Sequence, residues 1–167
     1  SRKRMIVQML RAFDPLLEID LDAARDRFIN IHHNFAALEE HDGELLAVHR
    51  KGATSADAGQ LGIIPGSMGA SSYIVRGKGN PESLRSCSHG AGRAMGRGAA
   101  RKQISEAEFQ RSLEGTYSKP SATYIDEAPQ AYKDIDVVIS RQLDLIDIVH
   151  KLSPIITVKG DSKARED

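Results

Sequence analysis

The sequence predicts a single α+β domain in which helices and short strands follow one another in irregular order. Helical and strand-like hydrophobic patterns both occur, and the 167 residues suffice for one domain with an ordinary core. Twelve of the fourteen glycines lie between Gly43 and Gly98, so this part of the chain must bend tightly. With no internal repeat and no clear linker, we expect the domain to cover residues 1–160, followed by a charged, disordered tail at 161–167.

The first expected helix covers residues 21–38. Its apolar residues recur at alternating steps of three and four, and Asp20 stands at the N-cap position. These apolar residues are Leu21, Ala24, Phe28, Ile31, Phe35 and Leu38. His33 would lie about 200° around this helix from Ile31, so we expect it to point away from the core.

Short strands are expected at residues 44–51 (ELLAVHRK) and 72–76 (SYIVR). Between them, residues 59–69 predict a strand and a tight loop. A second loop at 86–92 leads into a helix expected at 93–102.

The remaining elements are helical, with one more strand. Ser105 and the Glu108 three residues later match a capping box, which predicts a short helix ending at Gly115. The polar residues 116–130 predict a loop. Apolar spacing over 135–149 predicts an amphipathic helix, and 155–158 predict a short strand.

The formal net charge is zero, yet the charges are segregated along the chain. Residues 76–102 hold seven basic side chains and one acidic one, whereas 126–149 hold six acidic and two basic ones. The balance excludes a polycation that coats nucleic acid, but not a local basic patch. The basic segment fits either a solvated helix face or a phosphate-rich partner such as RNA.

Several compartments and classes are disfavoured by simple features. No apolar run approaches the ~18 to 20 residues that span a bilayer, and the basic start lacks the apolar core of a secretory signal. The single cysteine, Cys87, cannot form an internal disulfide. We therefore expect a cytoplasmic protein with no membrane partner.

Two glycine-rich loops, residues 65–69 and 89–93, have the composition of phosphate-binding loops because glycine lets backbone N–H groups converge. Neither has the spacing of a known nucleotide fingerprint, and a pair of tight turns would explain the same glycines. His89 opens the second loop among small residues. A histidine neutral at pH 7 has a ring nitrogen that can act as nucleophile or ligand, although a structural role is the alternative.

A complete metal site is not expected from the residues alone. His32 and His33 are adjacent, so on a helix they diverge by about 100°, and neither an HExxH nor a CxxC pattern is present. A partial site that includes His33 is compatible with the sequence.

Five ordered motifs stand out along the chain: 63–75 (IIPGSMGASSYIV), 79–83 (GNPES), 87–93 (CSHGAGR), 132–136 (YKDID) and 158–160 (VKG). His33–Asn34, 39–41 and 49–54 add to them. Together these motifs resemble the RtcB family of GTP-dependent RNA ligases across residues 20–160.

The resemblance implies a mechanism. His89 would attack the α-phosphate of GTP to form a covalent histidine–GMP intermediate, with Mn²⁺ neutralising the triphosphate. The guanylate would pass to an RNA 3′-phosphate, opened first if it is a 2′,3′-cyclic phosphate. An RNA 5′-hydroxyl would then displace GMP, as in tRNA splicing or RNA repair. The sequence leaves open whether an activating protein is required.

The resemblance also implies roles for individual residues. The expected guanylate-binding residues are Asn34, Pro65, Gly66, Ser67, Met68, Ser72, Gly90, Ala91, Gly92, Tyr132 and Lys159, and the expected manganese ligand is His33. His49, Arg50 and Lys51 are expected to meet RNA phosphates.

Two departures from the family pattern matter. Gly96 stands where the family usually has serine, and the other metal ligands belong to an N-terminal portion that this sequence does not include. We therefore expect the C-terminal portion of a ligase, whose missing N-terminal portion completes the site. The alternative is a non-catalytic GTP- or RNA-binding fragment.

Overall fold

The computed structural model describes residues 2–18, 20, 22–23, 28–32, 34–119 and 121–160. The chain forms two compact units, Ser1–Ile31 and His32–Asp167. The first unit holds helix α1 (Arg2–Leu17), which the sequence patterns did not predict. The expected tail at 161–167 lies outside the described residues.

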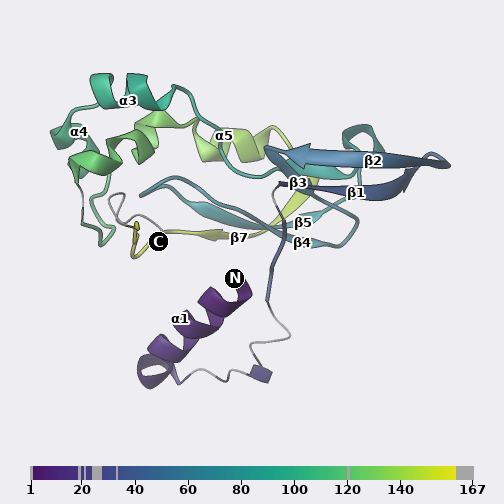
Figure 1. Cartoon of the computed structure of the whole chain (residues 1–167), viewed down its shortest axis with the longest axis horizontal. Helices are drawn as coiled ribbons and strands as arrows, with labels where there is room; N and C mark the ends of the chain where they lie inside the picture. Colours follow the sequence, from purple (N-terminus) through teal and green to yellow (C-terminus); the bar gives the residue numbers. More distant parts are fainter. Residues whose placement is uncertain are drawn as a thin grey trace, which may run out of the picture. The chain divides into compact units, whose positions relative to one another are not determined.

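The second unit is built from short helices and short antiparallel strands, which confirms the α+β class (Figure 1). Its strands are β1 (Asn34–His41), β2 (Glu44–Lys51), β3 (Ala53–Ser55), β4 (Leu61–Ile64), β5 (Ser72–Gly77), β6 (Ser86–Ser88) and β7 (Ile146–Leu152). Its helices are α3 (Arg97–Gln103), α4 (Glu106–Arg111) and α5 (Ile135–Ser140), with 3₁₀-helices η1 (Pro81–Ser83), η2 (Ala122–Glu127) and η3 (Pro129–Ala131). The strands form a β1–β2 hairpin, a β3–β6 pair and a β4–β5–β7 sheet.

The helix expected at residues 21–38 is wrong from residue 28 onwards: residues 28–32 are not helical, and β1 begins at Asn34. Exposed and more buried side chains alternate along β1, which is the period of a strand. Asp42 and Gly43 both have positive φ values, +52° and +81°, as the tight turn of a hairpin requires. Leu38, expected in a helical core, is 71% exposed. The register with β2, not the helical spacing, therefore decides which side chains are buried.

The helix expected at residues 135–149 is wrong beyond Ser140, where α5 ends. Ile135 and Ile139, one turn apart, are both buried, so the helical spacing holds for this first part. The chain then turns and enters β7, which pairs with β5 through Ile146 and Gly77. This pairing buries Ile146 completely. A partner strand some 70 residues earlier thus overrides the local periodicity.

Three smaller expectations also need correction. The helix expected from residue 93 begins at Arg97, because Arg93 forms a β-bridge with Tyr132. The expected loop at 116–130 contains η2 and the start of η3. The strand expected at 155–158 is reduced to one bridge, between Ile156 and Tyr117.

Other expectations are confirmed. Strands β2 and β5 lie where the sequence places them, and β4 precedes the first glycine-rich loop. At α4, the Ser105 hydroxyl accepts a hydrogen bond from the Glu108 N–H while the Glu108 carboxylate accepts one from the Ser105 N–H, which completes the capping box.

The second unit has two hydrophobic clusters. One lies between α5 and the β4–β5–β7 sheet and contains Ile64, Val75 and Ile139. The other joins α3, α4, η2 and η3 around Phe109. Tyr132 packs against both clusters, so the chain leaving η3 lies at their junction. In the part of the chain that the structure describes, no helix is long and apolar enough to cross a bilayer.

Candidate functional site

His89 follows directly after β6, the short strand that pairs with β3. Thr54 pairs with Cys87 and Ala53 with Ser88, and the His89 N–H donates to the Gly52 carbonyl at 3.3 Å. The imidazole is half-buried. The backbone of the expected nucleophile is therefore held at the end of a strand.

The two glycine-rich loops lie against each other, as the expected phosphate site requires. A Cβ added to Gly90 would lie 3.5 Å from the Pro65 carbonyl oxygen. Ala91 is buried in the core cluster beneath α5. Gly92 is exposed with φ of +73°, and its carbonyl accepts a hydrogen bond from the Lys133 N–H at 3.0 Å.

The loop between β4 and β5 folds tightly on itself. The Gly66 N–H donates to the Ser72 hydroxyl at 3.1 Å, and a Cβ at Gly66 would lie 2.1 Å from the Ser71 carbonyl oxygen. The Gly66 amide is thus engaged within the loop. Met68 is buried in the helical cluster, so its side chain belongs to the core. Pro65 is exposed and Ser67 half-exposed, which leaves these two on the accessible side.

Tyr132 and Lys159 meet at one carboxylate. The Tyr132 hydroxyl donates to Glu127 Oε2 at 2.9 Å, and Lys159 Nζ lies 3.4 Å from the same oxygen. Burial, followed by the bond to Glu127, raises the pKa of Tyr132. The structure thus brings together the aromatic and lysine residues expected to bind guanine, although 27 positions separate them.

Arg93 connects this group to the His89 loop. Its guanidinium lies over the Tyr132 ring, 4.8 Å from the centroid, and donates to the Tyr132 hydroxyl at 3.0 Å. The β-bridge between Arg93 and Tyr132 runs alongside the Gly92–Lys133 hydrogen bond. His89, its loop, Tyr132 and Lys159 therefore form one connected region.

The basic segment is largely neutralised by internal ion pairs. Arg97 and Arg101 lie 3.6 Å and 3.2 Å from Asp126, which is only 4% exposed. Lys78 pairs with Asp147 and Arg85 with Asp57. The acidic segment seen in the sequence thus neutralises much of the basic one.

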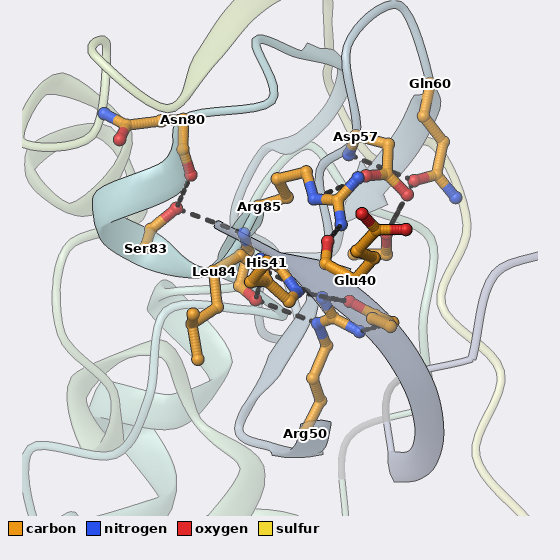
Figure 2. Close-up of polar contacts among 12 residues, drawn as sticks. Glu40, His41, Arg50, Asp57, Gln60, Asn80, Ser83, Leu84 and Arg85 are labelled. Atoms are coloured by element: carbon orange, nitrogen blue, oxygen red, sulfur yellow. Dashed lines mark hydrogen bonds and ion pairs between the residues drawn. The ribbon is translucent and has the colours of Figure 1, made fainter. Parts of the chain in front are cut away.

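Arg50, expected to meet RNA phosphates, is instead a buried anchor (Figure 2). It is 2% exposed, and its guanidinium forms a bidentate pair with Glu39. It also donates to the Ser86 hydroxyl at 2.8 Å and the Leu84 carbonyl at 2.9 Å. The expectation that Arg50 meets RNA phosphates is wrong, because these hydrogen bonds occupy its guanidinium. The neighbouring His49 and Lys51 are exposed.

Figure 2 also shows Arg85 reaching across from the segment before β6. Its guanidinium donates to the Glu40 carbonyl and pairs with Asp57 at 3.5 Å. Leu84 and Arg85 both have φ of +50°, a conformation that non-glycine residues rarely adopt. Arg50 and Arg85 together tie the β1–β2 hairpin to this strained entry into β6.

Of the two expected site residues at positions 33 and 34, the structure describes only Asn34. Asn34 is exposed and pairs with Lys51 at the open end of the hairpin. His33 lies outside the described residues. The neighbouring His32 carbonyl accepts a 3.0 Å hydrogen bond from Thr54, whose backbone pairs with Cys87 of β6. The chain just before His33 is therefore anchored to the strand pair that leads to His89.

The described residues do not fit a manganese site by themselves. Among them, no three histidine, cysteine or carboxylate side chains cluster as metal ligands. Cys87 is buried, and burial raises the pKa of its thiol to about 11, so the thiolate that binds metals is disfavoured.

Comparison with known proteins shows the family to which the chain belongs. The family model described as tRNA-splicing ligase RtcB matches residues 1–160. The chain belongs to the RtcB family. It is 53% identical over 132 residues to the RNA-splicing ligase RtcB of Escherichia coli, covering 79% of this chain and 32% of that protein.

More distant RtcB relatives align over nearly the whole chain. The tRNA-splicing ligase RtcB of Nanoarchaeum equitans is 33% identical over 186 residues, covering 96% of this chain and 39% of the relative. That of Pyrococcus horikoshii is 33% identical over 188 residues, covering 96% and 22%. The chain thus spans between about a fifth and two fifths of the length of these RtcB relatives.

Sequence patterns did not indicate that Arg50 is a buried structural residue, nor that Asp126 and Glu127 pair with basic side chains. The partners of these three residues lie far away in the chain; Arg50 and Ser86, for example, are 36 positions apart. No local spacing signals such contacts. The bidentate match between an arginine and a carboxylate becomes visible only when the hairpin has formed.

Proposed function

We propose that this chain supplies the nucleophile and the guanylate-binding surface of an RNA ligase. The observation that carries the proposal is the continuity of one region: the His89 loop lies beside Pro65 and runs along Tyr132, whose hydroxyl shares Glu127 with Lys159. Nucleotidyl transfer needs a nucleophile, a backbone that binds phosphate and a surface that binds the base, all at one place. The proposal assigns these parts to His89, to the glycine-rich turns, and to the aromatic ring beside the lysine.

In the proposed reaction, a neutral ring nitrogen of His89 attacks the α-phosphorus of GTP and pyrophosphate leaves. The resulting histidine–GMP bond breaks when an RNA 3′-phosphate oxygen takes the guanylate, which regenerates the imidazole. An RNA 5′-hydroxyl then attacks the activated 3′-phosphate, GMP leaves and the strand is joined. Where the RNA ends in a 2′,3′-cyclic phosphate, that cyclic phosphate is first hydrolysed to a 3′-phosphate. The whole reaction would serve tRNA splicing or RNA repair.

The other residues have binding roles in this proposal. Tyr132 provides a flat, half-buried ring beside the guanine, and Lys159 provides a cation held in place by Glu127. The part of the site that would contact the GTP phosphates is lined by Pro65, Ser67, Ser72, Gly90 and Gly92. The residues Gly66, Met68 and Ala91 would support this lining from the protein interior. Asn34 would approach the phosphates from β1. His33 is the manganese ligand we propose, and no step is assigned to the metal because the described residues do not complete a site for it.

Labelling with GTP tests this function. The full-length ligase that contains this chain is incubated with Mn²⁺ and GTP labelled at the α-phosphate, and we expect acid-labile label on His89, whereas the 167 residues alone are expected to be inactive. His89→Ala should remove the label, whereas His150→Ala should keep it because His150 is an exposed residue of β7.

Two outcomes would count against the proposal in different ways. Label that persists in His89→Ala would refute the nucleophile. Tight GTP binding by the unaltered protein without any labelling would favour the non-catalytic, GTP-binding alternative.

A further inference from the structure

Gln142 is a buried polar residue that the proposed reaction does not use. It lies in the turn between α5 and β7 and is 6% exposed. Its backbone is firmly held: its N–H donates to the Ile139 carbonyl at 3.1 Å, and its own carbonyl accepts from Leu145 and Ile146 at 3.0 Å and 3.1 Å. The side chain therefore extends from a rigid base into the interior.

The amide of Gln142 binds Ser88 at both ends. The Ser88 N–H donates to Gln142 Oε1 at 3.0 Å, and Gln142 Nε2 donates to the Ser88 hydroxyl at 2.7 Å. Both distances are those of well-formed hydrogen bonds. Ser88 and Gln142 are 54 positions apart, so this contact exists only in the folded chain.

Ser88, the last residue of β6, immediately precedes His89. Among the described strands, β6 pairs with β3 alone, where Ser88 lies opposite Ala53. The amide oxygen of Gln142 accepts the Ser88 N–H hydrogen bond, as the carbonyl of a neighbouring strand would do. The next N–H along the chain, that of His89, is bound by the Gly52 carbonyl. The backbone that aims the imidazole is thus held from both directions.

An apolar residue would satisfy packing at this position. Its backbone hydrogen-bond partners Ile139 and Ile146 are buried aliphatic residues, and burying an amide costs free energy unless both of its ends are bonded. The two hydrogen bonds of the Gln142 amide therefore fix the orientation of Ser88, which a leucine of similar volume could not do.

We propose that Gln142 is a positioning residue that fixes Ser88 and thereby the direction of the His89 imidazole. The proposal rests on the proposed role of His89 as nucleophile. Its physical reason is that a displacement of about 1 Å at a reacting atom can lower a rate ~100-fold. Gln142 itself touches neither GTP nor RNA in this assignment.

The test compares three variants with the unaltered protein. Gln142→Leu keeps the volume and removes both hydrogen bonds, and Gln142→Asn keeps the amide but is one methylene too short to reach. Ile139→Val, in the hydrophobic cluster between α5 and the β4–β5–β7 sheet, serves as a control that loosens packing without removing a hydrogen bond to Ser88. NMR of the Ser88 amide and the His89 ring, single-turnover labelling by GTP, and thermal unfolding are measured for each.

We expect Gln142→Leu and Gln142→Asn to shift or broaden the His89 ring resonances and to speed exchange of the Ser88 amide. Labelling at saturating GTP should slow by ~10- to 100-fold, with the half-saturating GTP concentration unchanged. Ile139→Val should lower the melting temperature yet leave the His89 resonances and the labelling rate unchanged.

The proposal is overturned if Gln142→Leu behaves like Ile139→Val, with lower stability but an unperturbed His89 ring. If the unaltered protein shows no label on His89, the proposed function fails, and the NMR comparison still decides whether Gln142 orients that side chain.

Discussion

At the scale of single residues, glycine has a defined role where the loop between β4 and β5 closes. A Cβ at Gly66 would meet the carbonyl oxygen of Ser71, a backbone atom that cannot move aside. Gly98, in the first turn of α3, has open space around it and an ordinary φ. The two glycines therefore make opposite contributions to stability.

Replacing each with alanine checks this contrast. We expect Gly66→Ala to lower the free energy of unfolding by about 2–4 kcal/mol, because the loop must open to relieve the clash. Gly98→Ala should raise it by about 0.5–1 kcal/mol, since alanine reduces the entropy of the unfolded chain. Urea denaturation measures both, and a neutral Gly66→Ala would mean that the loop is not closed as described.

The Glu39–Arg50 pair predicts a dependence of stability on pH. The hydrogen bond from Arg50 is the main cause that lowers the pKa of Glu39 from 4.5 to about 2. Since the folded-state pKa lies below the unfolded one, the stabilisation is present above pH 4.5 and is lost as the pH falls towards 2. We expect a loss of about 1–3 kcal/mol across this range.

Glu39→Gln is the matched variant. It should be less stable than the unaltered protein at pH 7, and its stability should vary less between pH 5 and 2. Thermal unfolding over that range provides the measurement. Parallel pH curves for the two proteins would show that Glu39 is not the group responsible.

At the scale of elements, the local signals that succeeded have a local cause. The capping box at Ser105 involves partners three positions apart, so the sequence contains all of it.

The two wrong helix predictions have different causes. The β1–β2 hairpin has a local signal, the Asp42–Gly43 dipeptide between two alternating segments, but the helical spacing across Phe28 and Phe35 masks it. The strand β7, beyond Ser140, has no such local signal, because it depends on its pairing with β5.

The cap of α4 yields a prediction at this scale. Ser105→Ala removes the acceptor for the Glu108 N–H and should lower the free energy of unfolding by about 1 kcal/mol. Ser105→Asp keeps an acceptor at the N-cap and should retain most of the stability. Chemical denaturation distinguishes the two, and equal losses would argue against capping as the cause.

At the scale of the whole molecule, charge is organised by tertiary contacts. The zero net charge conceals opposite segments in the sequence, and the fold brings those segments together again. Arg97 and Arg101 meet Asp126, Arg93 and Lys159 meet Glu127, and Lys78 meets Asp147. The basic segment is therefore much less cationic at the surface than its composition indicates.

Salt dependence of RNA binding tests this cancellation. If all seven basic residues of 76–102 contacted phosphates of single-stranded RNA, the logarithm of affinity would fall with the logarithm of salt concentration with a slope near −5. Because five of them are paired internally, we expect this segment to contribute a slope of about −1 to −2. The measurement compares the protein with a variant in which all seven are replaced by glutamine. A difference near −5 would show that the ion pairs open on RNA.

The sequence by itself determined the fold class, the strands around the glycine-rich loops, the α4 cap and the family resemblance with its candidate residues. Those features depend on neighbours within a few positions or on ordered motifs. Only the tertiary structure decided that Arg50 is buried, that Met68 belongs to the core, and that Tyr132 and Lys159 share Glu127. The physical reason is that burial and ion pairing depend on which distant segments meet, and no local pattern specifies those partners.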